Sequence, residues 1–197
     1  KAYGKQLVYF DNAATAQKPR AVLDLIQKMN GGVTANIHRA VHKLSAEATD
    51  LYEGGREAVR QYINAAKREE VILTSGTTAS INLVANTYGE HFLCEGDAVL
   101  VSESEHHSNI VPWQMLCERK GAELRVLPVD ENGAWRMDLL PGLLDERVKI
   151  IAAAHISNVL GLVNPVEELI RRGHEAGAVV LIDGAQGIVH QRVDVKA

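Results

Sequence analysis

The segment VVLIDGAQ, at positions 179–186, ends an apolar run with a carboxylate, Asp183. Four consecutive apolar residues without alternation are typical of a strand that is covered on both faces, as in a parallel sheet. Ligands of open parallel sheets bind in the crevice outside the carboxyl ends of the strands. Asp183 is therefore expected where a buried anion can contact a ligand, and Gln186 follows in the same turn.

Three other stretches carry polar residues just after apolar runs. In TSGTT, Thr77 and Thr78 follow a glycine at the start of a predicted helix, where hydroxyl and backbone N–H groups can hold a phosphate. His106 lies in SESEHHSN, and Asn158 lies in AAAHISNVLG. Taken singly, each has a simpler interpretation as a helix cap, a structural histidine or a turn residue. The lysine of an ATP-binding loop is absent from the TSGTT segment, so that interpretation is excluded.

Paired histidines raise the question of a metal site. The adjacent His106 and His107 would point to opposite sides of an extended chain and make a poor chelate. His38 and His42 can share a helix face, but Arg39 occupies the place of the glutamate of a zinc-protease motif. We therefore expect no metal at either pair.

One ligand would use all the polar groups that follow the strands. Pyridoxal 5'-phosphate needs a phosphate cradle, a flat group against its ring, a donor to its phenolic oxygen and an anion beside its pyridine nitrogen. The anion keeps that nitrogen protonated, so the ring can accept electrons when a bond at the substrate's α-carbon breaks. Opposite charges in a partly buried site favour the ionised forms of both groups. Asp183 is then the predicted partner of the pyridine nitrogen.

The elements that must position these residues alternate regularly. Apolar, β-rich runs occur at 71–74, 98–101, 124–127, 150–154 and 179–183, with helix-like segments at 45–66, 78–88, 109–120 and 165–176. Ser45 is the expected N-cap of the first helix, which Gly54 and Gly55 should each weaken by about 1 kcal/mol, with a kink there as one outcome. The pattern predicts an α/β fold with a mostly parallel sheet flanked by helices. No composition shift marks an internal domain boundary.

Composition places the chain among globular proteins of one domain or slightly more, because 46% of its 197 residues are hydrophobic and 23% are charged. The net charge of -4 comes from interspersed residues, which gives no support to binding of nucleic acid or an anionic membrane. No apolar stretch reaches the length of a bilayer span and the first residues do not form a signal peptide, so we expect a cytoplasmic protein. Cys94 and Cys117 have no metal-ligand spacing and are expected to be small buried hydrophobes.

The ordered set of motifs resembles a known enzyme family. Together, YFDNAATAQKP, NIHRAVHKLS, TSGTTASINLVAN, ESEHHSNIVPWQML, HISNVLG and DGAQ are similar to the amino-terminal half of a cysteine desulfurase of the sulfur-mobilisation type, a relative of selenocysteine lyase in the class V aminotransferase family. The likeness covers nearly the whole chain, and EHHSNIVPW with SNVLG is its most specific part. It implies a fold-type I large domain, with residues 1–18 as an amino-terminal segment and 19–197 as the first part of that domain.

The resemblance also implies a role for each polar residue. It places Thr77 and Thr78 at the cofactor phosphate, His106 against the cofactor ring and Asp183 at the pyridine nitrogen. It places Gln186 at the phenolic oxygen, Asn158 at the cofactor or the substrate, and His38 on the substrate side. His106 and Asp183 are the implied catalytic residues. Ala79 departs from the acidic residue expected after GTT, which puts local interface contacts in doubt rather than the chemistry.

By the same resemblance, the Schiff-base lysine and the catalytic cysteine are expected after Ala197, since Lys196 is too close to Asp183 in the sequence to be that lysine. The chain is then the first half of an enzyme and is expected to be inactive alone. The whole protein would be a homodimer that moves sulfur from L-cysteine to an enzyme cysteine as a persulfide, releases L-alanine, and supplies a sulfur-acceptor protein for iron-sulfur cluster assembly. L-Selenocysteine could replace L-cysteine as the substrate. Two alternatives stay open: another class V enzyme, such as a kynureninase-like hydrolase or an aminotransferase, and a short non-catalytic form.

Overall fold

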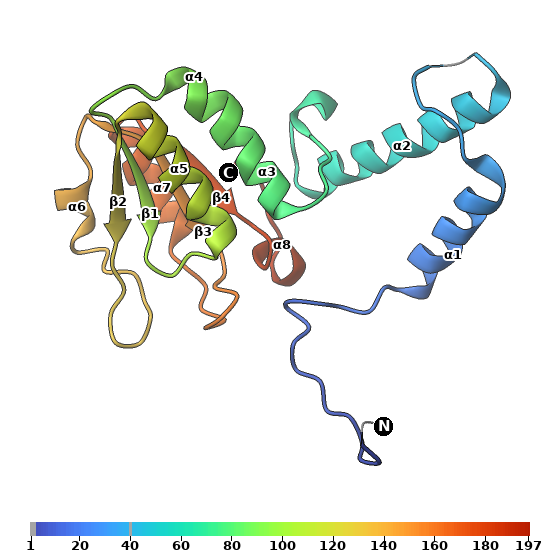
Figure 1. Ribbon diagram of the computed structural model, residues 1–197, viewed down its shortest axis with the longest axis horizontal. Coiled ribbons are helices and arrows are strands. Elements are labelled where there is room, and N and C mark those ends of the chain that lie inside the picture. Colours follow the sequence, from blue (N-terminus) through green and yellow to red (C-terminus); the bar gives the residue numbers. More distant parts are fainter. Residues whose placement is uncertain (1–2, 40) are drawn as a thin grey trace. The chain divides into compact units, whose positions relative to one another are not determined.

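The computed structural model describes residues 3–39 and 41–197, apart from the side chain of Val33. The chain forms two compact units, one made of residues up to Ile72 together with Asp194–Ala197, and one made of Leu73–Val193 (Figure 1). The sequence shows no change of composition at this division. Among the described residues, none of the helices combines the length and apolar character that a membrane span needs.

The first unit is mainly helical. Its α-helices are α1, Arg20–Lys28, and α2, Lys43–Tyr62, with a π-helical turn at Met29–Val33 and a 3-10 turn at Arg68–Glu70. The prediction of Ser45 as the N-cap of α2 is wrong. The helix begins earlier because His42 is the N-cap and its Nδ1 accepts from the Ser45 N–H at 3.2 Å. The α2 helix continues without a break through Gly54 and Gly55.

The second unit contains a four-stranded parallel sheet. Its strands are β1, Ala98–Ser102; β2, Glu123–Leu127; β3, Val148–Ala154; and β4, Val179–Asp183. Their order is β2-β1-β3-β4, and every neighbouring pair is parallel. The predicted α/β fold with a parallel sheet is confirmed, as are four of the five apolar runs that predicted strands.

The fifth run, residues 71–74, is not a strand in the structure. Val71 is buried and has extended backbone angles, but Ile72 and Leu73 are exposed. A strand needs a neighbour for its backbone N–H and C=O groups, and this segment pairs with none of the four described strands. Its apolar composition alone therefore gave the wrong prediction.

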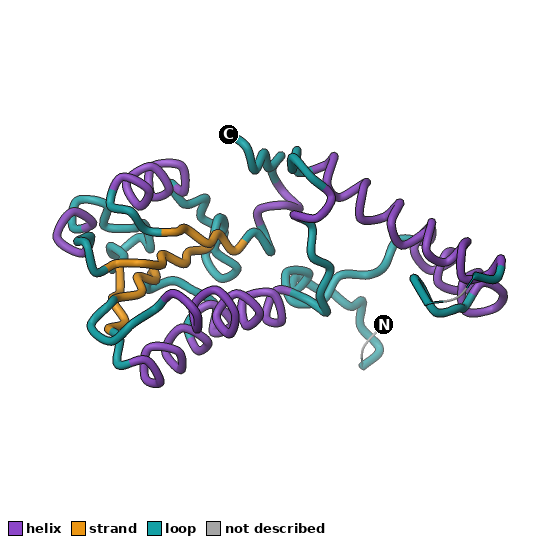
Figure 2. The backbone as a smooth tube through the Cα atoms, turned by 90° about the horizontal axis from the view of Figure 1, so that it is seen from above, coloured by secondary structure: helices purple, strands orange, loops and turns teal. Residues whose placement is uncertain are grey.

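Helices cover both faces of the sheet (Figure 2). They are α3, Thr77–Val84, continued by a π-helical turn at Ala85–Gly89 and by α4, Glu90–Phe92; α5, Val111–Lys120, preceded by a 3-10 turn at His107–Asn109; α6, Leu140–Leu143; α7, Val166–Glu175; and α8, Gly187–His190. Gly177, just past α7, has a φ of 81°, which glycine adopts without the steric cost that other residues carry.

Alternate residues of β1 enter two separate cores. Val99 and Val101 pack in a cluster with Trp113 of α5 and Ile81 of α3. Leu100 packs on the opposite face, in a cluster with residues of α6 and α7. This alternation explains why β1 is apolar from Ala98 to Val101, since both faces of the sheet are covered.

The two cysteines differ in environment. Cys117 is buried in the α5 core, as predicted, and burial raises the pKa of its thiol to about 11. Cys94 is exposed, so the prediction that it is buried is wrong. Leu93 and then Cys94 follow the end of α4, and of these two residues Leu93 is the one that enters the core.

Candidate functional site

The carboxyl ends of β1, β3 and β4 lie at one edge of the parallel sheet. At this edge Ala154 is the register neighbour of Asp183, and the His155 N–H donates to the Asp183 carbonyl at 2.9 Å. The loops that leave this edge carry His106, Asn158 and Gln186. The predicted residues of the second unit that follow strands are therefore grouped at the edge where open parallel sheets bind ligands.

Asp183 is the buried anion of this edge. Only 7% of the residue is exposed, and its Oδ1 accepts from the Ala185 N–H at 2.9 Å. This hydrogen bond within the short turn after the strand fixes the direction of the carboxylate. A fixed, buried carboxylate suits a ligand that presents a protonated nitrogen.

His106 is an exposed residue in the loop after β1, and its ring orientation is set locally. It is the N-cap of the His107–Asn109 turn, where its Nδ1 accepts from the Ser108 N–H at 3.1 Å and lies 2.8 Å from the Ser108 Oγ. Because Nδ1 acts as an acceptor, the neutral ring carries its proton on Nε2. The rings of His106 and His107 meet edge to face, with centroids 6.1 Å apart. Among the described residues, no group of three or more potential metal ligands is found.

Thr77 and Thr78 begin α3, as the phosphate hypothesis requires. The preceding Gly76 has a φ of 139° and makes no side-chain cap, and a Cβ built there would have no atom within 4 Å. The Thr74 hydroxyl accepts from the Gly76 N–H at 3.3 Å and lies 2.7 Å from the Ser80 Oγ, which shapes the loop. The helix start therefore has open space beside a glycine backbone and nearby hydroxyls, a donor set that fits a phosphate. The α3 helix contacts the His107–Asn109 turn, so both lie in the same part of the unit.

Asn158 and Gln186 lie in the turns that follow β3 and β4. The turn at Asn158 is closed by a hydrogen bond from the Gly161 N–H to the Ser157 carbonyl at 3.0 Å, and the Asn158 side chain is exposed. Gln186 is half-buried and is the N-cap of α8. Gly187, which follows it, has no room for a side chain because a Cβ would lie 2.8 Å from Cγ of His155.

Two buried polar residues at this edge were missed by the sequence reasoning. Asn164 is 5% exposed, and its Nδ2 donates to the Ala154 carbonyl at 2.8 Å. Glu105 is 8% exposed, and its carboxylate accepts from the Ala154 N–H at 2.9 Å and the Asn109 Nδ2 at 2.7 Å, and from the Ser102 hydroxyl.

The surroundings of Glu105 shift the pKa of its carboxyl in opposite directions. Burial raises the pKa of this carboxyl, the hydrogen bonds from Ser102, Asn109 and Ala154 lower it, and the nearby charge of Asp183 raises it further. The net effect is a raised pKa, with burial as the largest cause. In the sequence, Glu105 stands in the polar stretch SESEHHSN, which is typical of a surface loop and contains no signal of burial.

Comparison with known proteins identifies the family. A family model described as aminotransferase class-V matches residues 8–197. The chain belongs to the class V aminotransferase family. This match confirms the family that the motifs resembled, and the members of this family use pyridoxal phosphate.

The similar class V proteins include curated cysteine desulfurases. One from Cronobacter sakazakii is 50% identical over 194 residues, which cover 98% of this chain and 48% of that protein. One from Pectobacterium atrosepticum is 52% identical over 193 residues, covering 98% and 47% respectively. The chain therefore spans about half the length of the curated relatives it matches.

Solved structures support the class V fold. A crystal structure of the cysteine desulfurase CsdA from Escherichia coli superimposes with a TM-score of 0.85 at 41% identity, covering 94% of this chain and 47% of that one. The apo structure of a cysteine desulfurase from Thermococcus onnurineus NA1 gives a TM-score of 0.90 at 36% identity, covering 96% and 46%. The predicted fold-type I large domain is thus confirmed for this class V chain.

His38 belongs to the other compact unit, so its predicted place on the substrate side stays a prediction. Within its own unit it is held firmly: its φ is 56°, its N–H donates to the Thr49 Oγ1 at 3.1 Å, and its Nε2 lies 3.2 Å from the Glu53 Oε1. A left-handed conformation at a histidine is uncommon and is maintained here by these contacts.

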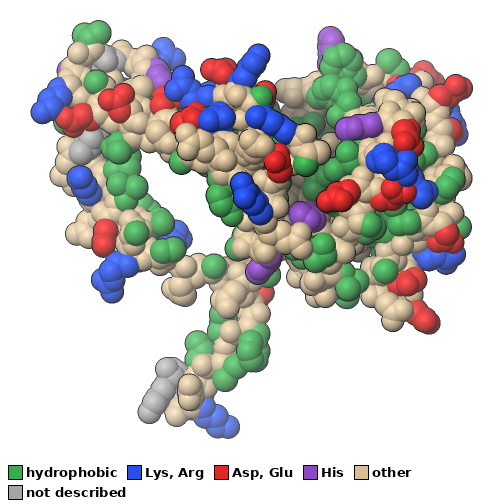
Figure 3. All heavy atoms as spheres, turned by 180° about the vertical axis from the view of Figure 1, so that it is seen from behind, with side chains coloured by type: hydrophobic (Ala, Val, Ile, Leu, Met, Phe, Trp, Pro, Cys, Tyr) green, Lys and Arg blue, Asp and Glu red, His purple; other side chains and the backbone are tan. Residues whose placement is uncertain are grey.

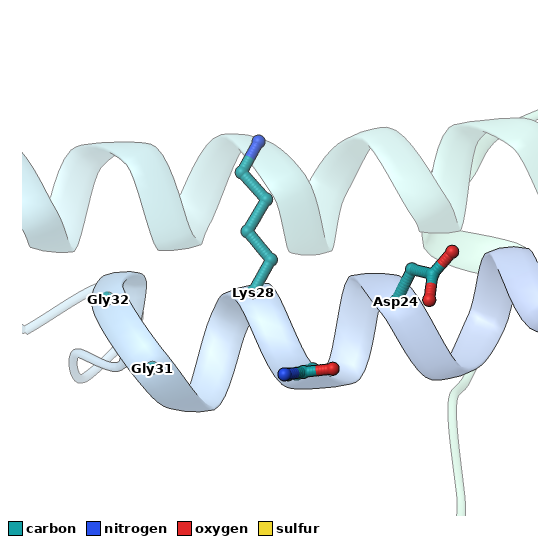
Figure 4. Close-up of a pocket in the computed structure, with 5 residues that line it drawn as sticks. Asp24, Lys28, Gly31 and Gly32 are labelled. Atoms are coloured by element: carbon teal, nitrogen blue, oxygen red, sulfur yellow. The ribbon is translucent and has the colours of Figure 1, made fainter.

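A separate open pocket lies on the first unit and is lined by α1 and the turn after it. Its lining residues are Asp24, Gln27, Lys28, Gly31 and Gly32, and Figure 4 shows the Lys28 side chain extending from α1 toward the neighbouring helix. The pocket is open and contains none of the residues that the motifs predicted. We therefore place the candidate site of this class V protein at the sheet edge.

Proposed function

We propose that this chain supplies the cofactor-binding half of a pyridoxal-phosphate-dependent cysteine desulfurase. The observation that carries the proposal is the grouping of Asp183, His106, Asn158 and Gln186 at the carboxyl edge of one parallel sheet, in a chain about half identical to curated cysteine desulfurases over nearly its whole length. The donor and acceptor groups at this edge and at the start of α3 fit the parts of the cofactor.

When bound, pyridoxal phosphate supplies an electron-accepting ring for bond cleavage at the α-carbon of the substrate. In this proposal, Asp183 holds a proton at the pyridine nitrogen. The carboxylate is suited to that task because it is buried and already oriented by the Ala185 N–H. Its surroundings therefore need little reorganisation when the ring accepts electrons.

The remaining residues bind and orient. Thr77, Thr78 and the first backbone N–H groups of α3 hold the phosphate, where the helix dipole favours an anion. The His106 ring, fixed through its Nδ1, provides a flat surface against the cofactor ring. Gln186 donates to the phenolic oxygen, and Asn158 orients cofactor or substrate.

For the whole protein we propose a homodimer of the cytoplasm. It takes L-cysteine, passes sulfur to a cysteine thiolate as a persulfide, releases L-alanine and hands the sulfur to an acceptor protein for iron-sulfur cluster assembly. L-selenocysteine is the alternative substrate. None of the site residues is a lysine or a cysteine that could react directly, so we propose that residues 1–197 alone release no sulfide.

The reaction is tested with the full-length protein and L-cysteine in the presence of a thiol reductant. We expect sulfide and L-alanine in equal amounts. Hydrolysis of kynurenine, or amino transfer to a keto acid, without release of sulfide would contradict the desulfurase and favour another class V activity.

The role of Asp183 is tested by Asp183→Ala in the full-length protein. We expect turnover to fall by at least about 100-fold, because the nitrogen loses the anion that keeps it protonated, while cofactor occupancy changes far less. Asp138→Asn is the matched control, since Asp138 is an exposed aspartate of the same unit paired with Arg136 at 2.7 Å. Turnover close to that of the unsubstituted protein with full cofactor occupancy would rule the role out.

A further inference from the structure

The buried carboxylate of Glu105 connects β1 and the turn before α5, which are close to it in the sequence, to Ala154 of β3, which lies 49 residues away. Its Oε1 accepts from the Ala154 N–H of β3 at 2.9 Å and from the Ser102 hydroxyl of β1. Its Oε2 accepts from Nδ2 of Asn109, the last residue of the turn before α5, at 2.7 Å. The other hydrogen-bond partner of the Asn109 amide is Trp113, and this partner fixes which way the amide faces.

Trp113 is fully buried, and its Nε1 donates to the Asn109 Oδ1 at 2.9 Å. An indole N–H can only donate, so Oδ1 of the amide must face Trp113 and Nδ2 must face Glu105. The backbone N–H of Ala154 is likewise only a donor. Position 105 is therefore surrounded by donors, and it requires a side chain that accepts at both of its terminal atoms.

Glu105 is also adjacent to both residues that are predicted to contact the cofactor ring. His106 follows it directly and caps the turn that ends at Asn109. On the other side, Ala154 is the register neighbour of Asp183, whose charge acts on Glu105. The same carboxylate thus connects the loop of His106 to the strand pair that carries Asp183.

We propose that Glu105 is a positioning residue of the cofactor site, whose carboxylate sets the spacing between the loop of His106 and the strand end of Asp183. It acts through these two residues and need not touch the cofactor. This inference rests on the proposed function, because the spacing matters only if a cofactor ring contacts both residues.

The first test is Glu105→Gln in the full-length protein. An amide at position 105 places a donor opposite either the Ala154 N–H or the Asn109 Nδ2, so one hydrogen bond is lost and two donors face each other. We expect pyridoxal phosphate to bind about tenfold more weakly. We also expect a change in the visible circular dichroism of the bound cofactor, which reports the orientation of its ring.

The decisive test is the double variant Glu105→Gln/Asn109→Asp, which exchanges the carboxylate and the amide. The new amide can accept from the Ala154 N–H and donate to the new carboxylate, which still accepts from Trp113. All the bonds between the three segments are then restored, although the charge has moved. We expect cofactor affinity within about twofold of the unsubstituted protein and recovery of the dichroism band.

Glu103→Gln is the matched control for charge on the same loop. Glu103 is exposed, and its Oε2 accepts from the Val129 N–H at 2.9 Å, a group that makes no hydrogen bond to Glu105. Melting temperatures of all variants separate a loss of stability from a loss of positioning. The control is expected to leave affinity and dichroism unchanged.

Two results would overturn the inference. One is a Glu105→Gln protein whose melting temperature falls while its affinity and dichroism stay unchanged, which indicates a purely structural role. The other is a double variant that melts normally but does not regain affinity. If the unsubstituted protein binds no pyridoxal phosphate, the proposed function itself is contradicted, and the inference with it.

Discussion

The two compact units bury their apolar side chains to very different extents. In Leu73–Val193, every residue of β1 and every residue of β3 except Lys149 is buried between helices. In the other unit, the large apolar residues of α1 are 43% to 50% exposed, and Phe10 of the amino-terminal segment is 92% exposed. Figure 3 shows hydrophobic side chains at the surface along that segment.

This difference shows that an apolar pattern stabilises a helix only where another element packs against it. Among the residues of the first unit whose side chains are described, the buried ones are Ser45, Ala48, Ala65 and Val71, which supply little apolar area. Tertiary packing provides most of the stability of protein helices, so α1 and α2 gain less of it within their own unit. We therefore expect the sheet unit to be the more stable of the two.

The largest expected effect compares two leucines. Leu100 of β1 is 1% exposed and Leu51 of α2 is 46% exposed. We expect Leu100→Ala to lower the free energy of unfolding of its unit by about 2–5 kcal/mol, and Leu51→Ala to cost less than about 1 kcal/mol, because only the first leaves a cavity. Both tryptophans lie in the sheet unit, so urea unfolding followed by their fluorescence measures the cost of Leu100→Ala, and amide hydrogen exchange of α2 measures the cost of Leu51→Ala. Equal costs for the two leucines would contradict the comparison.

A smaller effect compares two helical glycines. A Cβ at Gly173 of α7 would lie 2.7 Å from the Ile151 Cδ1 and 2.8 Å from the Val180 Cγ2, whereas a Cβ at Gly54 of α2 meets nothing within 4 Å. We expect Gly173→Ala to destabilise its unit by about 1–3 kcal/mol through overpacking. Gly54→Ala should stabilise α2 by up to about 1 kcal/mol through helix propensity. Amide hydrogen exchange in each helix measures both changes, and a stabilising Gly173→Ala would show that α7 packs more loosely than the distances indicate.

The smallest expected effect is a difference in pH dependence. Hydrogen bonds from Arg60 and Gln61 lower the pKa of Glu57, a half-buried residue of α2, to about 2. Its contribution to stability is therefore complete above its ordinary pKa of 4.5 and is lost as the pH falls toward 2. Glu105 has the opposite sign: because burial raises its pKa, the free energy of unfolding from this group rises as the pH falls through that raised value.

Hydrogen exchange of the α2 amides between pH 4.5 and 2 measures the effect of Glu57. Glu57→Gln should reduce the loss of protection over that range. Glu47→Gln, in the same helix, is the charge-matched control and should leave the loss in place. If both substitutions act alike, general charge repulsion rather than the Glu57–Arg60 pair explains the acid sensitivity.

Local patterns in the sequence predicted much of the sheet unit. Apolar, β-rich runs identified β1 to β4, and their alternation with helices predicted parallel pairing, because a parallel pair needs a crossover connection. The same pattern failed at residues 71–74, where strand formation depends on a neighbour that the run itself does not specify. The Ser45 cap failed because His42, a less common capping residue, supplied the acceptor for the helix start.

The sequence by itself determined the positions at which strands end and the polar residues that follow them, since these depend on neighbours along the chain. That was enough to predict Asp183 and the loops of His106, Asn158 and Gln186 as one site. Only the tertiary structure decided that Glu105, from a polar stretch typical of a surface, is buried as an acceptor for donors from β1, β3 and the turn before α5. The physical reason is that a carboxylate is buried only where donors satisfy it, and one of these donors, the Ala154 N–H, lies 49 residues away in the sequence, where no local pattern indicates that the two groups will meet.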